Sequence, residues 1–155
     1  MENTTLLYLI KKQSGQITDI MLAMKKIRFG IGKYNGVGGK VKEGESVEDA
    51  TVRETSEEIG VNVDVKDLAK IGEIEFRFQD KSEWNQVVHI YTTEIWAGDP
   101  TESEEMKPYW YNLKDIPYDY MWEDDKYWLP KVLNGEYVKG YCLFDSNQKI
   151  IEHNL

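Results

Sequence analysis

The sequence predicts a single α/β domain built around a mixed β-sheet. Segments with the alternating or β-branched pattern of strands stand on both sides of one clear amphipathic helix. The length of 155 residues is enough for one hydrophobic core and short for two. No internal repeat or Pro/Gly/Ser-rich linker divides the chain, so one domain over residues 1–155 is expected.

A β-hairpin is predicted at the start of the chain. Residues 5–10 and 17–24 are apolar strand candidates, and the turn-forming residues 13–16 join them. Residues 30–44 follow and hold six of the twelve glycines. Such density predicts a backbone with unusual dihedral angles, or one that closely approaches another group.

The clearest helix is predicted over Ser46–Ile59. Ser46 is a favourable N-cap, and Asp49 stands three residues later, where a capping box needs an acceptor. Gly60 suits the left-handed residue that ends a helix.

The rest of the chain is expected to complete the sheet and add a second helix. This helix should run from Asp124 or Asp125 to Leu133 and must accommodate Pro130. The remaining strand candidates are residues 71–78, 86–95, 109–113, 141–144 and 149–152, the last two as a closing hairpin.

Composition and charge limit the classes of partner. The net charge of −9 argues against a polymeric nucleic acid partner, which would need a basic face. Residues 25–42 nevertheless hold six Lys or Arg and no Asp or Glu. This segment is either a solvated basic loop or a site for a small polyanion such as a nucleotide.

No targeting or membrane segment is expected. The apolar runs are far shorter than the ~18–20 residues that span a bilayer, and the first residues lack the pattern of a secretory signal. The single cysteine, Cys142, cannot form an internal disulfide. We therefore expect a cytoplasmic, monomeric protein without a membrane partner.

Three glutamates share one flank of the predicted helix. Glu54, Glu57 and Glu58 stand at i, i+3 and i+4, and Arg53 stands four residues before Glu57. Adjacent carboxylates repel each other by roughly 0.2–0.5 kcal/mol per pair, and a divalent cation would reverse that sign. Magnesium prefers such hard oxygen ligands. The alternative is a solvated acidic face.

The spacing around these glutamates matches a known signature. Residues 39–61 read Gly39-x5-Glu45-x7-Arg53-Glu54-Thr55-x-Glu57-Glu58-x-Gly60-Val61. This resembles the box of the Nudix hydrolases, G-x5-E-x7-R-E-U-x-E-E-x-G-U, in which U is a bulky aliphatic residue. Only Thr55 departs, at the first U, where we expect some loss of packing and no effect on metal chemistry.

The resemblance implies an α/β/α sandwich that binds Mg²⁺, with Mn²⁺ as a substitute. Glu58 would be the general base, with Glu57 as the alternative, and Arg53 would support them. Glu105 would reach the metal from outside the box, unless it belongs only to a charged surface loop. The implied metal ligands are the Gly38 carbonyl, Glu54, Glu57, Glu58 and Glu105.

Further segments resemble the Nudix enzymes that hydrolyse oxidised purine nucleoside triphosphates. These segments are residues 24–30, 34–36, 121–125 and 127–130. The resemblance implies that Asn35, Asp124 and Asp125 read the purine edge and that Trp122 stacks on its face. The other implied substrate contacts are Thr5, Lys25, Phe29, Gly38, Gly39, Phe76 and Trp128.

The residue types are compatible with base recognition, although other interpretations exist. Two acids in an apolar pocket should differ in ionisation, which places a donor beside an acceptor. Alternatively, Asp124 and Asp125 cap the second helix, Trp122 and Trp128 are core residues, and Asn35 takes a left-handed turn.

The predicted activity is hydrolysis of oxidised purine (deoxy)nucleoside triphosphates, such as 8-oxo-dGTP, to the monophosphate and pyrophosphate. Such an enzyme would sanitise the nucleotide pool. One alternative is a pyrophosphohydrolase of another nucleotide, namely a dinucleoside polyphosphate, a nucleotide sugar or an ordinary NTP. Another is a nucleotide-binding module without catalysis, for which the complete glutamate set has no use.

Overall fold

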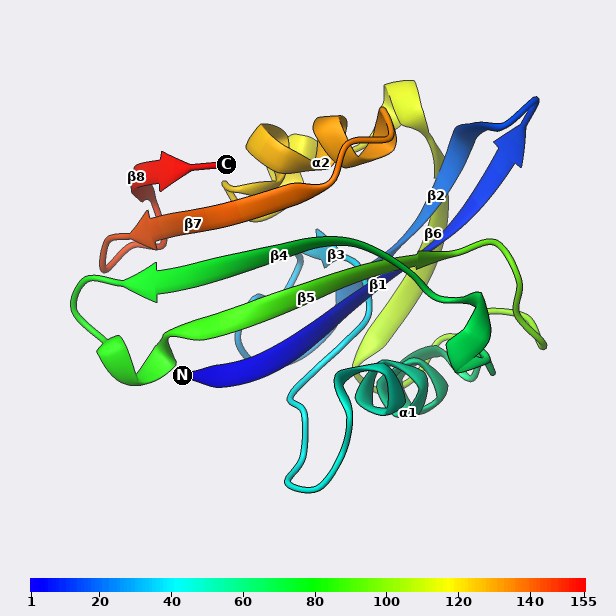
Figure 1. The fold of residues 1–155 in the computed structure, drawn as a ribbon, viewed down its shortest axis with the longest axis horizontal. Helices are drawn as coiled ribbons and strands as arrows, with labels where there is room; N and C mark the ends of the chain where they lie inside the picture. The colour runs from blue at the N-terminus through cyan, green and yellow to red at the C-terminus, as the bar shows by residue number, and fades with distance from the viewer.

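Two helices flank one mixed β-sheet in the computed structural model, which describes residues 1–155 (Figure 1). The strand order is β3-β2-β1-β5-β4-β7-β8, and β6 pairs with β2. The pairs β1–β5 and β4–β7 are parallel and the others antiparallel, which confirms the predicted mixed sheet. The strands are β1 (Glu2–Gln13), β2 (Gln16–Lys25), β3 (Tyr34–Asn35), β4 (Ala69–Phe78), β5 (Gln86–Thr93), β6 (Met106–Asn112), β7 (Val138–Phe144) and β8 (Ile150–Asn154).

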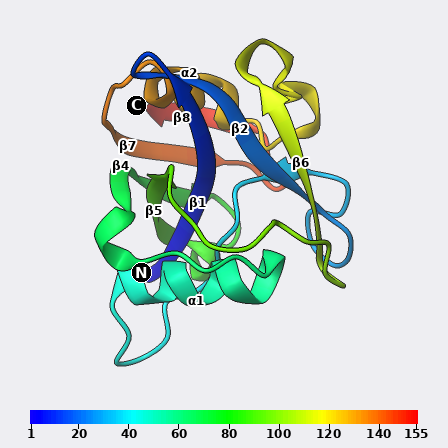
Figure 2. The same ribbon diagram turned by 90° about the vertical axis from the view of Figure 1, so that its right-hand side faces the viewer.

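The helices α1 (Val47–Ile59) and α2 (Asp125–Leu133) lie on opposite sides of the strands (Figures 1 and 2). This is the α/β/α arrangement that the resemblance implied. Neither helix is long and apolar enough to cross a membrane. Short 3₁₀ turns connect the larger elements at Val65–Asp67, Ser82–Trp84, Leu113–Asp115 and Tyr118–Tyr120.

Strand β1 is the centre of the fold because both of its faces are covered. Its first part pairs with β5 and its end pairs with β2. Leu6 and Tyr8 belong to the core cluster that includes residues of α2, whereas Leu7 and Leu9 belong to the cluster that includes residues of α1. A strand buried on both faces is apolar without alternation, which explains the continuous run in the sequence.

The caps of α1 follow the prediction closely. The Ser46 hydroxyl accepts a hydrogen bond from the Asp49 backbone N–H at 3.0 Å, and Gly60 adopts a left-handed φ of 69°. The reciprocal bond, from the Ser46 backbone N–H to the Asp49 carboxylate, is missing, so only half of a capping box forms. Thr55 is fully buried and donates its hydroxyl to the Thr51 carbonyl at 2.8 Å. This bond satisfies the polar group that departs from the signature.

Several strand boundaries differ from the prediction. Strand β1 begins three residues earlier than expected, and β3 was not predicted. These added residues gain their hydrogen bonds from neighbouring strands, so their conformation depends on tertiary pairing. Pro130 lies inside α2 on its exposed side.

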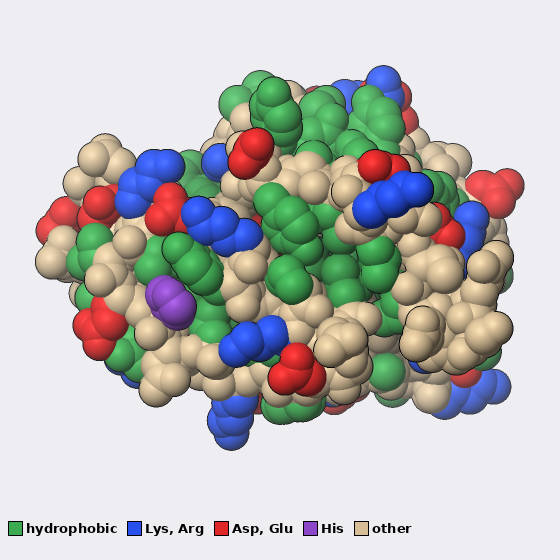
Figure 3. All heavy atoms as spheres, turned by 90° about the horizontal axis from the view of Figure 1, so that it is seen from above, with side chains coloured by type: hydrophobic (Ala, Val, Ile, Leu, Met, Phe, Trp, Pro, Cys, Tyr) green, Lys and Arg blue, Asp and Glu red, His purple; other side chains and the backbone are tan.

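Figure 3 looks onto the face of the molecule that carries α2. Hydrophobic side chains gather near the middle of this face, and basic and acidic side chains lie interspersed around them. This face therefore mixes both signs of charge.

Candidate active site

The glycine-dense segment runs tightly along β1. Leu7 and Val37 exchange backbone hydrogen bonds of 2.7 and 3.0 Å, and the Thr5 N–H donates to the Gly39 carbonyl at 2.8 Å. A Cβ on Gly38 would lie 1.8 Å from the Thr5 carbonyl oxygen, and one on Gly39 would lie 2.5 Å from the Glu54 carboxyl carbon. Glycine is required here for close approach to the strand and to α1.

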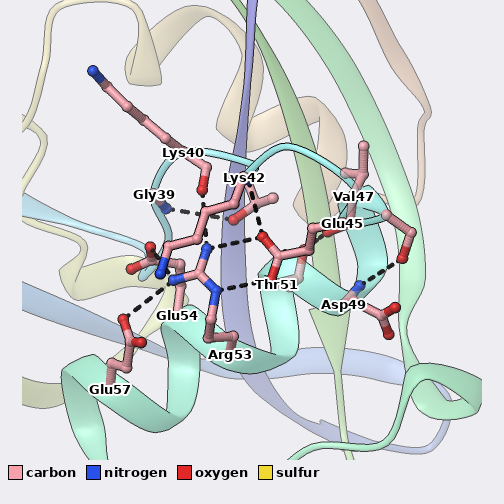
Figure 4. A network of polar contacts seen from close by, with 12 residues as sticks. Gly39, Lys40, Lys42, Glu45, Val47, Asp49, Thr51, Arg53, Glu54 and Glu57 are labelled. Atoms are coloured by element: carbon pink, nitrogen blue, oxygen red, sulfur yellow. Dashed lines mark hydrogen bonds and ion pairs between the residues drawn. The ribbon is translucent and has the colours of Figure 1, made fainter.

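Arg53 joins this segment to α1 (Figure 4). Its guanidinium donates to both Glu45 oxygens, at 2.8 and 3.0 Å, in a bidentate arrangement. It also donates to Glu54 at 2.9 Å, to Glu57 at 3.2 Å and to the Lys40 carbonyl at 3.0 Å. The hydrogen bonds from Arg53 lower the pKa of Glu45 to about 2. The predicted contact with Glu57 is therefore present, but Glu45 is the main partner.

The three predicted metal ligands on α1 have different surroundings. The Glu57 side chain is 56% exposed and the Glu54 side chain 16%, whereas Glu58 is buried. One Glu58 oxygen, Oε2, is buried without a hydrogen-bond partner. Burial, and then the charge of Glu54, raise the pKa of Glu58 to about 8, and the charge of Lys25 acts in the opposite direction. Burial thus outweighs the attraction of Lys25, and the ionised form of Glu58 is costly in this arrangement.

These carboxylates fit the chemistry of a divalent cation. No three acidic, His or Cys side chains converge closely enough in the structure to enclose an ion. However, the donors are hard oxygens, and the unpartnered Glu58 oxygen marks a place where positive charge would remove an existing cost. Glu105 contributes to the same local field because its charge also raises the pKa of Glu58. Its carboxylate pairs with exposed Arg28 at 2.7 Å.

A cavity of about 450 Å³ lies beside the C-terminal end of α1, where Glu58 lies. All of the predicted substrate contacts line its wall: Thr5, Lys25, Phe29, Asn35, Gly38, Gly39, Phe76, Trp122, Asp124, Asp125 and Trp128. Glu58 lines it too. The fold thus brings residues from β1, β2, β4, the glycine-dense segment and both helices to one cavity.

The two aspartates are almost completely buried at the start of α2. Asp124 is 1% exposed and Asp125 is 2% exposed. Asp124 Oδ2 accepts a hydrogen bond from Trp128 Nε1 at 2.6 Å, whereas Asp124 Oδ1 and Asp125 Oδ2 have no partner. The helix-capping alternative is wrong for Asp124, because its carboxyl makes no bond to a helix N–H. Both unpartnered oxygens therefore remain available to a ligand.

The aspartates differ in protonation. Burial raises the pKa of Asp124 to about 6, and the Trp128 N–H partly opposes this shift. Burial and the charge of Asp124 raise the pKa of Asp125 well above its usual range. Of the two carboxyls, Asp125 therefore holds its proton to the higher pH, so Asp124 can accept a hydrogen bond while Asp125 donates one. This agrees with the predicted pairing of a donor and an acceptor.

The aromatic residues occupy two kinds of position. Trp122 is half-buried, with its ring centroid 5.3 Å from that of Phe29, so it is not a core residue. Trp128 is fully buried in the core, as the alternative proposed, and also holds Asp124. Asn35 lies in β3 and does not adopt a left-handed turn, so that alternative is wrong.

The basic segment of residues 25–42 contains both surface residues and cavity residues, so each of its two interpretations applies to part of it. Lys26, Arg28 and Lys40 form ion pairs with acidic residues near the surface. Lys25 and Lys33 form no ion pair and line the cavity. Lys40 lines the cavity as well, so three lysines of this segment contribute positive charge there.

Sequence reasoning missed some residues of the cavity. Phe78 alternates with Phe76 along β4, so the strand pattern contained a signal for it. Phe144 and Gln86 come from distant strands, and no local pattern singles them out. Cys142 is buried in β7, and burial raises its pKa to about 12, which agrees with its interpretation as a strand residue.

Comparison with known proteins agrees with this geometry. Residues 3–132 match the NUDIX domain. The oxidized purine nucleoside triphosphate hydrolase of Danio rerio is 44% identical over 88% of this chain and 85% of that protein, and the Mus musculus protein of the same name is 43% identical over the same shares. The crystal structure of a MutT protein from Bacillus halodurans has a TM-score of 0.83 at 19% identity, over 99% of this chain and 97% of that one. With the domain match over most of its length and these relatives, the chain belongs to the Nudix hydrolase family.

Proposed function

We propose that the protein hydrolyses oxidised purine (deoxy)nucleoside triphosphates, such as 8-oxo-dGTP, to the monophosphate and pyrophosphate. The observation that carries this proposal is the wall of the cavity. Asp124 and Asp125 line the same cavity as Glu58 and Gly38, so one nucleotide can place its base at one group and its phosphates at the other. The names of the relatives from Danio rerio and Mus musculus support the same substrate class.

At the base end, the cavity offers hydrogen bonds and stacking together. Ionised Asp124 accepts, protonated Asp125 donates, and Asn35 adds an amide. Trp122 and Phe29 supply aromatic faces, and stacking on a base contributes about 1–3 kcal/mol per contact. A purine with both donors and acceptors on its edge suits this wall.

At the phosphate end, Glu54, Glu57 and Glu58 would hold Mg²⁺, or Mn²⁺ in its place, with the Gly38 carbonyl and Glu105 as further ligands. When bound, the ion would neutralise the phosphates and stabilise charge that develops at phosphorus. Arg53 keeps Glu54 and Glu57 in position through its hydrogen bonds. Lys25 lines the cavity, and its positive charge would attract the phosphate tail.

Glu58 is the proposed general base, with Glu57 as the alternative. The unpartnered Glu58 oxygen is free to accept a proton from the attacking water. Burial and the charge of Glu54 raise the pKa of Glu58 to about 8, and a divalent cation bound beside it would favour the ionised form that this role requires. By contrast, Glu57 already accepts a hydrogen bond from Arg53.

The biological role in this proposal is removal of oxidised purines from the nucleotide pool before they are incorporated. The partner is a small nucleotide, which agrees with a chain whose net charge is −9. A cytoplasmic location and a monomeric state stay predictions from the sequence.

The test is pyrophosphate release from a panel of nucleotides, with Mg²⁺ and with chelator. The panel contains 8-oxo-dGTP, 2-hydroxy-dATP, dGTP, dATP, an ADP-sugar and a dinucleoside polyphosphate. We expect turnover confined to the oxidised purines and abolished by chelator. Broad or sugar-nucleotide turnover would support a different pyrophosphohydrolase, and tight binding without product would support a binding module.

A further inference from the structure

A buried tyrosine contacts Asn35 from the interior of the protein. Tyr8 lies in β1, is fully buried and is not part of the cavity wall. Its hydroxyl lies 3.2 Å from Asn35 Oδ1. A Cβ added to Gly36 would lie 3.0 Å from the Tyr8 ring, so the glycine lets the ring reach this position. Tyr8 thus contacts Asn35, which lines the cavity, without lining the cavity itself.

The hydrogen bonds of Asn35 determine which way its amide points. Asn35 Oδ1 accepts from the Gly36 N–H at 2.9 Å as well as from the Tyr8 hydroxyl. An amide oxygen has two lone pairs, and both are used. Rotating the amide by half a turn would place its NH₂ group against the Gly36 N–H, donor against donor. The NH₂ group is therefore the only free polar group that Asn35 offers to the cavity.

The Tyr8 hydroxyl remains a donor under all ordinary conditions. Burial, and then the charges of Asp125 and Asp124, raise its pKa well above the usual range. A protonated hydroxyl beside an amide oxygen donates to it, so it reinforces the orientation that Gly36 sets. Without this hydroxyl, one lone pair of Asn35 Oδ1 would be unsatisfied in the interior, and the amide would gain freedom to rotate.

On the basis of the proposed function, we infer that Tyr8 is a positioning residue for purine recognition. Its hydroxyl fixes the Asn35 amide as a hydrogen-bond donor toward an acceptor atom of the purine. The complete polar wall then consists of a donor at Asn35, a donor at Asp125 and an acceptor at Asp124. This inference assigns a specificity role to a side chain outside the cavity.

The first test is Tyr8→Phe, which keeps the ring and removes only the hydroxyl. A neutral hydrogen bond contributes about 1 kcal/mol, so KM for 8-oxo-dGTP should rise about fivefold while kcat changes little. In the Asn35→Ala background the same substitution should leave KM unchanged, because no amide is left to position. A similar rise in KM in both backgrounds would show that Tyr8 acts through general structure and would overturn the inference.

Tyr91→Phe is the matched control. Tyr91 is also buried, and its hydroxyl donates to Glu48 on α1 at 3.0 Å, outside the cavity wall. Both variants should lower the melting temperature, Tyr91→Phe by at least as much as Tyr8→Phe, because its hydroxyl donates to a carboxylate. Only Tyr8→Phe should change KM. A KM shift of equal size in Tyr91→Phe would remove the support for a specific role.

A second variant tests the donor assignment even if Tyr8→Phe fails to fold. Asn35→Asp can still accept from Tyr8 and Gly36, but it presents an acceptor to the cavity. We expect it to bind 8-oxo-dGMP, measured by titration calorimetry, more weakly than Asn35→Ala does. Binding equal to that of the unchanged protein would overturn the assignment.

The calorimetric probe also separates this inference from the proposed function. If the unchanged protein cleaves no oxidised purine triphosphate but binds 8-oxo-dGMP in a Tyr8-dependent way, the proposed function fails and the inference stands. If it cleaves 8-oxo-dGTP and Tyr8→Phe matches it in KM, the inference alone fails. Absence of both cleavage and binding would overturn both.

Discussion

Replacing Asp124 by Asn should stabilise the protein at neutral pH while damaging its activity. Asn has nearly the same shape and can still accept the Trp128 N–H, which lies 2.6 Å from Asp124 Oδ2. The substitution removes a charge that is buried and has one unpartnered oxygen. Burial of that charge is costly, so the neutral side chain should raise the free energy of unfolding.

The size of this effect follows from the pKa of Asp124. The pKa rises from 3.8 in the unfolded chain to about 6 in the folded protein. Each unit corresponds to about 1.4 kcal/mol, so ionised Asp124 costs about 3 kcal/mol above pH 6. Below pH 3.8 both states bind the proton and the cost vanishes. Because the folded pKa is the higher one, the stability of the unchanged protein falls as pH rises from about 4 to 6.

Urea denaturation at pH 7.5 and pH 4.5 measures this cost. Asp124→Asn should be more stable than the unchanged protein by about 3 kcal/mol at pH 7.5 and by only about 1 kcal/mol at pH 4.5. Its kcat/KM for 8-oxo-dGTP should fall, because the cavity loses its charged acceptor. A gain in stability that is the same at both pH values, or no gain at pH 7.5, would refute the reasoning.

Three further predictions concern the rest of the site. Glu58→Gln should remove most pyrophosphate release and keep the 8-oxo-dGMP affinity, and it should not lower the melting temperature, because burial also raises the pKa of Glu58; equal losses in turnover, binding and stability would contradict a base role. Asp125→Ala should lower the ratio of kcat/KM between 8-oxo-dGTP and dGTP more than it weakens Mg²⁺ dependence, and an unchanged ratio would defeat this assignment. Arg53→Lys keeps the charge but cannot form the two-pronged contact with Glu45, so kcat should fall about tenfold with little change in base affinity, as activity assays and calorimetry will measure. Full activity in Arg53→Lys would show that positive charge alone is sufficient there.

The local sequence was sufficient to predict α1 and its acidic flank. Ser46 and Gly60 mark the two ends of the helix, and both cap it as expected. The period of the helix also placed Glu54, Glu57 and Glu58 on neighbouring positions. These features depend on residues a few positions apart, so the chain encodes them without reference to the rest of the fold.

The helical period did not predict how far each glutamate is buried. Glu57 and Glu58 are adjacent in sequence, yet the Glu57 side chain is 56% exposed and Glu58 is buried against the cavity. The difference arises because α1 packs on the sheet along one edge of its acidic flank. Likewise, the contact between Arg53 and Glu45 crosses the loop before the helix, and only the folded loop decides its geometry.

The base end depended most on tertiary structure. The residues Asn35, Asp124 and Asp125 were identified by resemblance, but the sequence left open whether the aspartates cap α2 or face a ligand. Burial and the bond from Trp128 decided against capping for Asp124. The sequence by itself determined the local elements and the chemistry they contain, because helix caps and periodicity act over short distances. Tertiary structure decided which polar atoms are left without partners and which side chain contacts Asn35 from the interior. Burial and contacts between distant strands exist only in the folded chain.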